Sequence, residues 1–229
     1  MNLTFRPNLA KAVCFALVIL MVGATLSSAA IINDLRNTGL DGIGSYIATH
    51  GTPDGNYTML SSPLVYPAVT VNDTVWPIAP NGPWLINNPG SRWIGPDASS
   101  NGAGGNYVYR TTFTVPANAI LSTVNVSGLW ATDDQGIDVV INGISTGQTD
   151  FGMSAFAPFT ITSGFVFGLN TLDFHVVNAN IGTNPTGLRV DRVLGTYRVP
   201  EPLSGGLILL GWSLSTLMLR RSRSLARRT

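Results

Sequence analysis

The chain has 229 residues, of which only 11% are charged and 45% hydrophobic, and its formal net charge is +1. Residues 31–199 hold eleven Asp and six Arg with no Lys or Glu, a net charge of −5. Nucleic-acid binding depends on Lys and Arg that neutralise phosphates, so this acidic middle argues against a nucleic-acid partner. The only cysteine is Cys14, so residues 31–229 have no disulfide and no Cys nucleophile.

The first thirty residues have the pattern of a secretory signal peptide. The basic residues Arg6 and Lys11 precede an apolar run over 12–26, and the small residues 28–30 follow it. Signal peptidase requires small residues at these positions, so we expect cleavage after Ala30 by signal peptidase, following export by the secretion machinery. The alternative is an uncleaved membrane helix, which the shortness of the run disfavours.

Residues 31–198 are predicted to form one all-β domain, because short β-branched and aromatic runs alternate with turn residues. The clearest strand is 107–115, in which every second residue from Tyr107 to Val115 lies on one face. Further strands are expected at 122–129, 137–141, 156–161, 164–167, 172–177, 187–190 and 194–199, with Ile137, Val139 and Ile141 on one face. Asn142-Gly143 is the strongest short hairpin signal. This spacing predicts an antiparallel β-sandwich.

Several segments of this domain resemble the galactose-binding-like jelly-roll modules found on many glycosidases and surface proteins. The resemblance rests on 109–116, 129–134, 139–143 and 168–174 together with Asn178. In such modules an Asn-Gly hairpin and a Gly-x-Asn-x-Leu turn recur as framework. The resemblance covers 107–190 and implies a jelly roll that binds carbohydrate, whereas 31–106 is loop-rich and matches less clearly.

Tryptophans are the first candidates for sugar contact, because an indole face is a flat apolar platform with polar groups free at its edges. Trp76, Trp84, Trp93 and Trp130 all qualify by type, and Trp130 ends a predicted core strand. Trp84 and Trp93 flank the loop 87–90, which makes them the better candidates for ligand binding. The alternative is that they are core residues, which is the common fate of tryptophan.

Asp133, Asp134 and Asp138 form a candidate calcium site, since hard cations are bound by several convergent oxygens. Their spacing is not that of an EF-hand, and the alternative is turn formation between strands. Asp133, Asp134 and Arg189 are also candidate ligand contacts. A guanidinium can form a bidentate hydrogen bond with a sugar, or equally with an internal acid such as Asp173.

Catalysis is not predicted. His50 and His175 are the only histidines, and neither lies in a nucleophile or metalloprotease motif. His175 alternates with Asp173 along a predicted strand, which places both on its solvent face. A pair of Asp residues acting on a glycosidic bond is a remote alternative, because spacing along the chain cannot test the separation of two carboxylates.

The C-terminal residues 199–229 combine three features in a fixed order. Pro200-Glu201-Pro202 is followed by an apolar stretch over 203–219 and then by an arginine-rich tail that begins with Arg220 and Arg221. Seventeen residues of helix span ~25 Å, at the lower limit for crossing a bilayer. The positive-inside rule places the arginines in the cytoplasm. The apolar stretch and the arginines would also suit a plain C-terminal membrane anchor.

This tail resembles the PEP-CTERM sorting signal, known from bacteria that make extracellular polysaccharide. The resemblance implies that an exosortase-type membrane enzyme recognises the motif and processes the chain near it. We therefore expect an exported protein, held transiently at the inner membrane, then released to the cell surface or extracellular matrix. A non-catalytic association with exopolysaccharide is the expected function. A self-assembling matrix or coat protein without a glycan ligand is the alternative, and a glycan hydrolase is the remote one.

Overall fold

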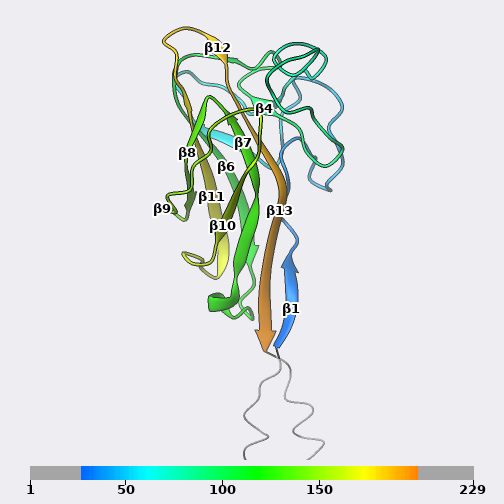
Figure 1. The fold of residues 1–229 in the computed structure, drawn as a ribbon. Helices are drawn as coiled ribbons and strands as arrows, with labels where there is room; N and C mark the ends of the chain where they lie inside the picture. The colour runs from blue at the N-terminus through cyan, green and yellow to red at the C-terminus, as the bar shows by residue number, and fades with distance from the viewer. Residues whose placement is uncertain (1–26, 201–229) are drawn as a thin grey trace, which may run out of the picture. The chain divides into compact units, whose positions relative to one another are not determined.

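The computed structural model of the chain describes residues 27–200 (Figure 1). The predicted leader up to residue 26, and Glu201, Pro202, the apolar stretch 203–219, Arg220 and Arg221 lie outside the described residues. Within 27–200, no helix has the length and apolar character needed to cross a membrane. Residues Ala29–Arg198 form one compact unit, which holds both sheets apart from the first two residues of β1 and the last two of β13.

Two antiparallel sheets pack face to face in this unit (Figure 1). One sheet has the order β10-β7-β13-β4-β3, with β1 also paired to β13, and the other has the order β2-β6-β11-β8-β9. A two-stranded ribbon, β12-β5, lies outside both. The strands are β1 Ser27–Ile32, β2 Thr58–Ser61, β3 Val69–Thr70, β4 Ile94–Gly95, β5 Asn101–Gly102, β6 Gly105–Val115, β7 Asn125–Asp133, β8 Gln135–Ile141, β9 Ile144–Ser145, β10 Ala157–Ile161, β11 Gly168–Asn178, β12 Asn184–Pro185 and β13 Gly187–Pro200.

The predicted all-β antiparallel sandwich is confirmed, and its core has the predicted alternation. Strand β6 pairs with β11 along its full length, and the side chains of β6 that were predicted to share a face are all buried. Phe174 of β11 is central, because its ring contacts those of Tyr57, Trp130 and Phe159. Since side chains alternate across a strand, the opposite face of the same sheet carries the polar residues. There Arg110 forms two hydrogen bonds with Asp173, at 2.6 and 2.7 Å.

One of the two predicted framework turns is confirmed, whereas the Gly-x-Asn-x-Leu stretch is the start of strand β11 and not a turn. Asn142 and Gly143 join β8 to β9 with φ values of 50° and 79°, the left-handed conformation that a two-residue hairpin needs. Asn170, in the Gly-x-Asn-x-Leu stretch, is fully buried. Its amide nitrogen donates to the carbonyls of Val166 and Gly168, and its Oδ1 accepts from the backbone N–H of Val166 and from Asn142 Nδ2, at 2.8–2.9 Å.

Three strand predictions need correction. Ile137 does not share the buried face of Val139 and Ile141, because a bulge in the pairing with β11 shifts the register beside it and leaves Ile137 40% exposed. Gly136 takes the inward position instead, under the ring of Trp130. The segment 164–167 is a loop, not a strand. Residues 187–190 and 194–199 belong to one strand, β13, interrupted by a bulge.

Residues 33–104 form long loops with only short strands, and buried side chains rather than strand ladders tie them to the sandwich. Thr38 Oγ1 donates to the carbonyl of Arg92 and accepts from the N–H of Val190 on β13. The guanidinium of Arg92 donates to the carbonyls of Ile47 and Val71. These contacts hold the outer surface of the loops in place against the sandwich.

Strand β1 runs through the predicted leader cleavage position. Ala30 lies inside this strand and is half-buried, and Ile32 packs against Gly195 of β13. Cleavage after Ala30 would leave only two residues of β1 on the sandwich. Cleavage itself stays a prediction.

Candidate functional site

Trp84 and Trp93 are core residues, which corrects the prediction that they form a sugar platform. They are 2% and 0% exposed, and their rings lie 4.2 Å apart, centroid to centroid. Trp93 Nε1 donates to the carbonyl of Leu85 at 2.9 Å, and Trp84 Nε1 donates to Asp133 Oδ2 at 2.7 Å. Neither ring has a free face for a ligand, because the loop between them folds both indoles inward.

The three aspartates of the predicted calcium site are each engaged by a different partner. Asp133 is buried against Trp84, Asp134 Oδ2 accepts from the N–H of Ala179, and Asp138 Oδ1 accepts from the N–H of Gly147. Within residues 27–200, no cluster of three or more His, Cys, Asp or Glu is arranged to hold a metal ion. Their contacts therefore favour turn formation between strands over calcium binding.

Asp133 is nevertheless unusual electrostatically. Burial is the main cause that raises the pKa of its carboxyl; with the opposing hydrogen bond from the Trp84 indole and the raising effects of the neighbouring Asp134, the pKa is about 7. Because the carboxyl is 6% exposed, a ligand cannot reach it directly. Its pKa is a property of the core and not of a binding surface.

Arg189 also belongs to the core. It is 1% exposed and donates to the carbonyl of Ile86 at 2.7 Å and to Ser91 Oγ at 3.0 Å. Its guanidinium lies 5.1 Å from the ring centroid of Phe156. The alternative that Arg189 has a structural role is confirmed. Its partners are backbone carbonyls and Ser91, and not Asp173, which is paired with Arg110.

Among the tryptophans of residues 27–200, only Trp76 presents its ring to solvent. It is 59% exposed, on the loop that also carries Asp73. Three residues of extended chain reach at most ~11 Å, so the two residues must lie close together. The same loop therefore carries an exposed indole and a partly exposed carboxylate.

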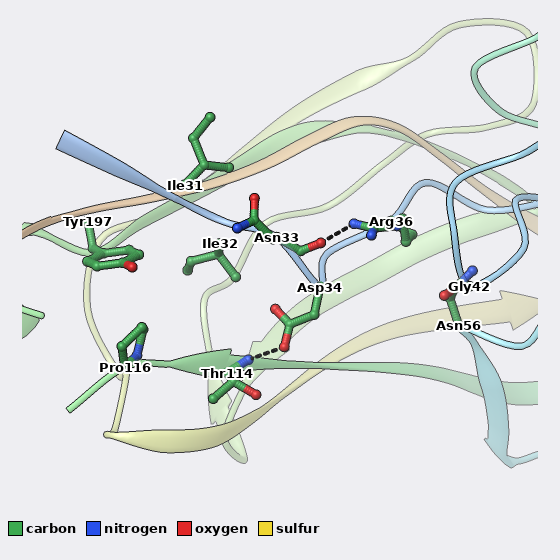
Figure 2. A pocket seen from close by; sticks show the side chains of 10 residues that line it. All are labelled: Ile31, Ile32, Asn33, Asp34, Arg36, Gly42, Asn56, Thr114, Pro116 and Tyr197. Carbon is green, nitrogen blue, oxygen red and sulfur yellow. Dashed lines mark hydrogen bonds between the residues drawn. The ribbon is translucent and has the colours of Figure 1, made fainter. Parts of the chain in front are cut away.

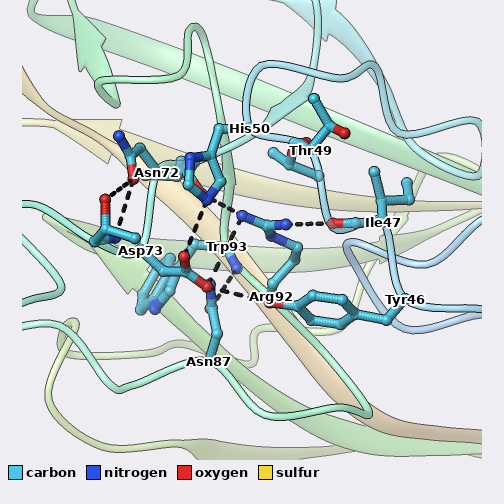
Figure 3. A network of polar contacts seen from close by, with 12 residues as sticks. Tyr46, Ile47, Thr49, His50, Asn72, Asp73, Asn87, Arg92 and Trp93 are labelled. Carbon is cyan, nitrogen blue, oxygen red and sulfur yellow. Dashed lines mark hydrogen bonds and ion pairs between the residues drawn. The ribbon is translucent and has the colours of Figure 1, made fainter.

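Asp73 is the centre of a polar network on these loops (Figure 3). Its Oδ2 accepts from Tyr46 Oη and from Asn87 Nδ2, both at 3.1 Å, and its Oδ1 contacts His50 Nε2 at 3.1 Å. The side chains of Asp73 and His50 are 24% and 32% exposed. Two carboxylate oxygens offer about four lone pairs, so three contacts leave Oδ1 able to accept another hydrogen bond.

A buried cation underlies this network. Arg92 NH2 lies 3.9 Å from Asp73 Oδ2, too far for a hydrogen bond, and the Arg92 side chain is fully buried. Burial raises the pKa of Asp73, but the hydrogen bond from Asn87, the charge of Arg92 and the other donors outweigh it and lower the pKa. The ring of Tyr46 covers Arg92 at 5.1 Å. Asp73 is therefore a preorganised, ionised acceptor.

A separate pocket of about 450 Å³ lies beside β1 and the end of β13 (Figure 2). Its apolar wall includes Ile31, Pro116 and Tyr197, and its polar side includes Asp34 and Arg36. Asp34 Oδ2 accepts from the N–H of Thr114 at 2.8 Å. This volume is within the ~300–1,000 Å³ usual for small-molecule sites.

The sequence indicated Trp76 by residue type alone, and it indicated neither Asp73 nor the pocket. Asn72-Asp73-Thr74 matches only a short glycosylation pattern, and its Asn72 side chain in fact accepts from Thr74. Trp76 stands before Pro77 in a proline-rich stretch, and that loop signal could have favoured it over Trp84. The pocket is assembled from segments around residues 34, 114 and 197, so no local pattern marks it.

No protein-family model matches this chain, and no curated protein matches it. Among solved structures, a family 29 carbohydrate binding module complexed with mannohexaose is similar at 8% identity and a TM-score of 0.37, covering 75% of this chain and 92% of that one. The CBM35 from Paenibacillus barcinonensis has 18% identity and a TM-score of 0.34, covering 64% and 98%. An enzymatically active domain of bacteriophage CBA120 tailspike protein 4 has 14% identity and a TM-score of 0.38, covering 62% and 19%. These similarities are too weak to assign a ligand to this chain.

Proposed function

We propose that this chain is an exported, non-catalytic β-sandwich module that associates with extracellular polysaccharide. In this proposal a signal peptide directs export, and the PEP-CTERM-like tail is processed by an exosortase-type enzyme at the inner membrane. The protein then works at the cell surface or in the extracellular matrix. The tail resemblance supports the location, and the loop surface supports the binding function.

One observation carries the binding function: exposed Trp76 lies on the same loop as Asp73, an ionised and partly exposed acceptor. Sugar rings present an apolar C–H face, which stacks on an indole, and hydroxyls at their edges, which donate to a carboxylate. Tyr46 and Asn87 hold the carboxylate in place. The indole therefore suits the apolar face of a sugar ring, and the carboxylate suits its hydroxyls. Binding of this kind needs no catalytic group.

The test is a binding screen of the full chain, solubilised in mild detergent, against extracellular polysaccharides and neutral oligosaccharides. Trp76→Ala and Asp73→Asn should each weaken binding about tenfold or more, because they remove the stacking face and the charged acceptor. Phe151→Ala is the matched control, since Phe151 is an exposed aromatic residue (84%) on another loop. A chelator should leave binding unchanged, because the three candidate calcium ligands are not assembled.

Absence of binding to every polysaccharide, in a folded chain, would reject this function. Concentration-dependent oligomers would then favour the matrix or coat alternative. The sheet edges give that alternative little support: β2, β3, β9 and β10 are two to five residues long. Pro158 further blunts the β10 edge. Release of reducing ends from the polysaccharide would instead indicate the hydrolase.

A further inference from the structure

The pocket beside β1 and β13 has the composition of a second ligand site, distinct in its residues from the Trp76 loop. One wall is apolar, from Ile31, Pro116 and the ring of Tyr197, and the other is polar, from Asp34 and Arg36 (Figure 2). A polar ligand with an apolar face would contact both walls. Contact between that apolar face and the apolar wall would remove apolar surface from water, which is favourable.

The two charged side chains of the pocket each retain hydrogen-bonding capacity. Asp34 uses Oδ2 for the N–H of Thr114, which leaves Oδ1 as an acceptor. Arg36 uses Nη1 for the carbonyls of Asn33 and Leu35; within the described residues, its Nε and Nη2 have no partner and can donate to a ligand. An adjacent acceptor and donor suit a hydroxyl group, which both donates and accepts.

Charge sets the class of ligand. In the chain that keeps residues 1–30, which is the form tested below, Asp34 and Arg36 are the only charged side chains that line the pocket within the described residues, and their charges cancel. A net neutral ligand is therefore favoured over an anion or a cation. The volume of about 450 Å³ limits the ligand to a short unit and not a long stretch of polymer.

We propose that this pocket binds a neutral sugar unit of a polysaccharide, with its ring against Tyr197 and its hydroxyls on Asp34 and Arg36. The ligand class rests on the proposed function, but the site does not depend on Trp76. A chain with both sites would hold two sugar segments at once, which raises apparent affinity for a polymer above that for a short oligosaccharide.

Isothermal titration calorimetry on the full chain in detergent tests the pocket, with galactose oligomers as the neutral probe and galacturonic acid oligomers of equal length as the acidic probe. Asp34→Asn keeps an acceptor for the N–H of Thr114 but removes the charge, so it should weaken neutral-sugar binding about tenfold. Tyr197→Ala should do the same, although it also removes packing against the core. Phe151→Ala is again the control and should bind as the unmodified chain does.

The outcomes separate this proposal from the proposed function. Binding that Trp76→Ala abolishes and Asp34→Asn leaves unchanged would overturn the pocket but keep the function. Binding that depends on Asp34 and not on Trp76 would support the pocket and reject the loop site. Tighter binding of the acidic probe would overturn the neutral ligand class. No binding of either probe to the unmodified chain would overturn the pocket, whereas the proposed function is rejected only if every polysaccharide of the wider screen also fails to bind.

Discussion

The indole N–H of Trp84 donates to the carboxylate of Asp133 at 2.7 Å, across 49 positions of sequence. This contact joins the loop that carries Trp84 to the end of β7. It also leaves an acidic group inside the core, with a pKa of about 7. Trp84, a candidate for sugar binding, thus donates a hydrogen bond that stabilises the buried carboxylate of Asp133.

The first prediction concerns the pH dependence of stability. The folded pKa of Asp133, about 7, lies above the ordinary value of 3.8 that applies to the unfolded chain. The folded state therefore binds a proton that the unfolded state has lost, and its stabilisation is full below pH ~4 and disappears as pH rises through ~7. We expect the free energy of unfolding in urea to fall by on the order of a few kcal/mol between pH 5 and pH 8.

Asp133→Asn should flatten this dependence, because the amide cannot ionise. Burial raises the pKa of Asp54 and Asp150 as well, so some slope should remain. Asp138→Asn, at a half-exposed position on β8, is the control and should keep the slope. An Asp133→Asn chain whose pH dependence equals that of the unmodified protein would show that Asp133 is not its source.

The second prediction concerns the bulge in β8. A Cβ atom on Gly136 would stand 2.4 Å from Cη2 of Trp130 and 3.1 Å from Cβ of Asp150. Gly136→Ala should therefore destabilise the domain by ~1–3 kcal/mol, measured by thermal or urea unfolding. Gly55→Ala, where a Cβ meets nothing within 4 Å, should stay within ~0.5 kcal/mol. Equal effects of the two changes would contradict the packing seen at Gly136.

The third prediction concerns Arg189. Arg189→Met removes the donors to Leu85, Ile86 and Ser91 and leaves the Ile86 carbonyl without its side-chain donor, whereas the Leu85 carbonyl keeps the donor of Trp93; we expect a cost of ~2–4 kcal/mol. Local loosening should appear first, as faster hydrogen exchange in residues 84–93. Arg198→Met, on the exposed face of β13, should change neither measurement. Unchanged exchange in Arg189→Met would mean that other contacts hold the loop.

The fourth prediction concerns Asn170, the third residue of β11. Asn170 makes four hydrogen bonds inside the protein, so Asn170→Ala leaves several buried groups without partners. We expect a loss of ~2–4 kcal/mol in urea unfolding. Asn180→Ala, at an exposed position, serves as its comparison and should be near neutral. A loss below ~1 kcal/mol in Asn170→Ala would show that water replaces the amide.

Much of the sandwich could be predicted from local pattern. Alternation predicted the buried face of 107–115, and Asn142-Gly143 predicted a hairpin, because both depend on neighbours in sequence. The bulge that exposes Ile137 depends on the register with β11, a partner more than thirty residues away. The alternation of side chains within β8 alone does not reveal this register.

The site could not be predicted for the same kind of reason. Trp76 and Trp84 are eight residues apart on loops of similar composition, yet one is 59% exposed and the other 2%. The difference comes from Asp133, which binds the Trp84 indole from another part of the chain. Asp73 likewise gains its character from Arg92, Tyr46 and Asn87, which only the folded loops bring together.

The two buried arginines have a consequence for how this surface can evolve. Arg92 and Arg189 anchor the loops mainly through backbone carbonyls, at Ile47, Val71, Leu85 and Ile86. A carbonyl is present whatever the side chain, so the outward residues of these loops can be replaced without loosening the anchor. Variants that differ at Ile43, Trp76 or Ile86, all exposed, could therefore acquire new ligand preferences on an unchanged scaffold.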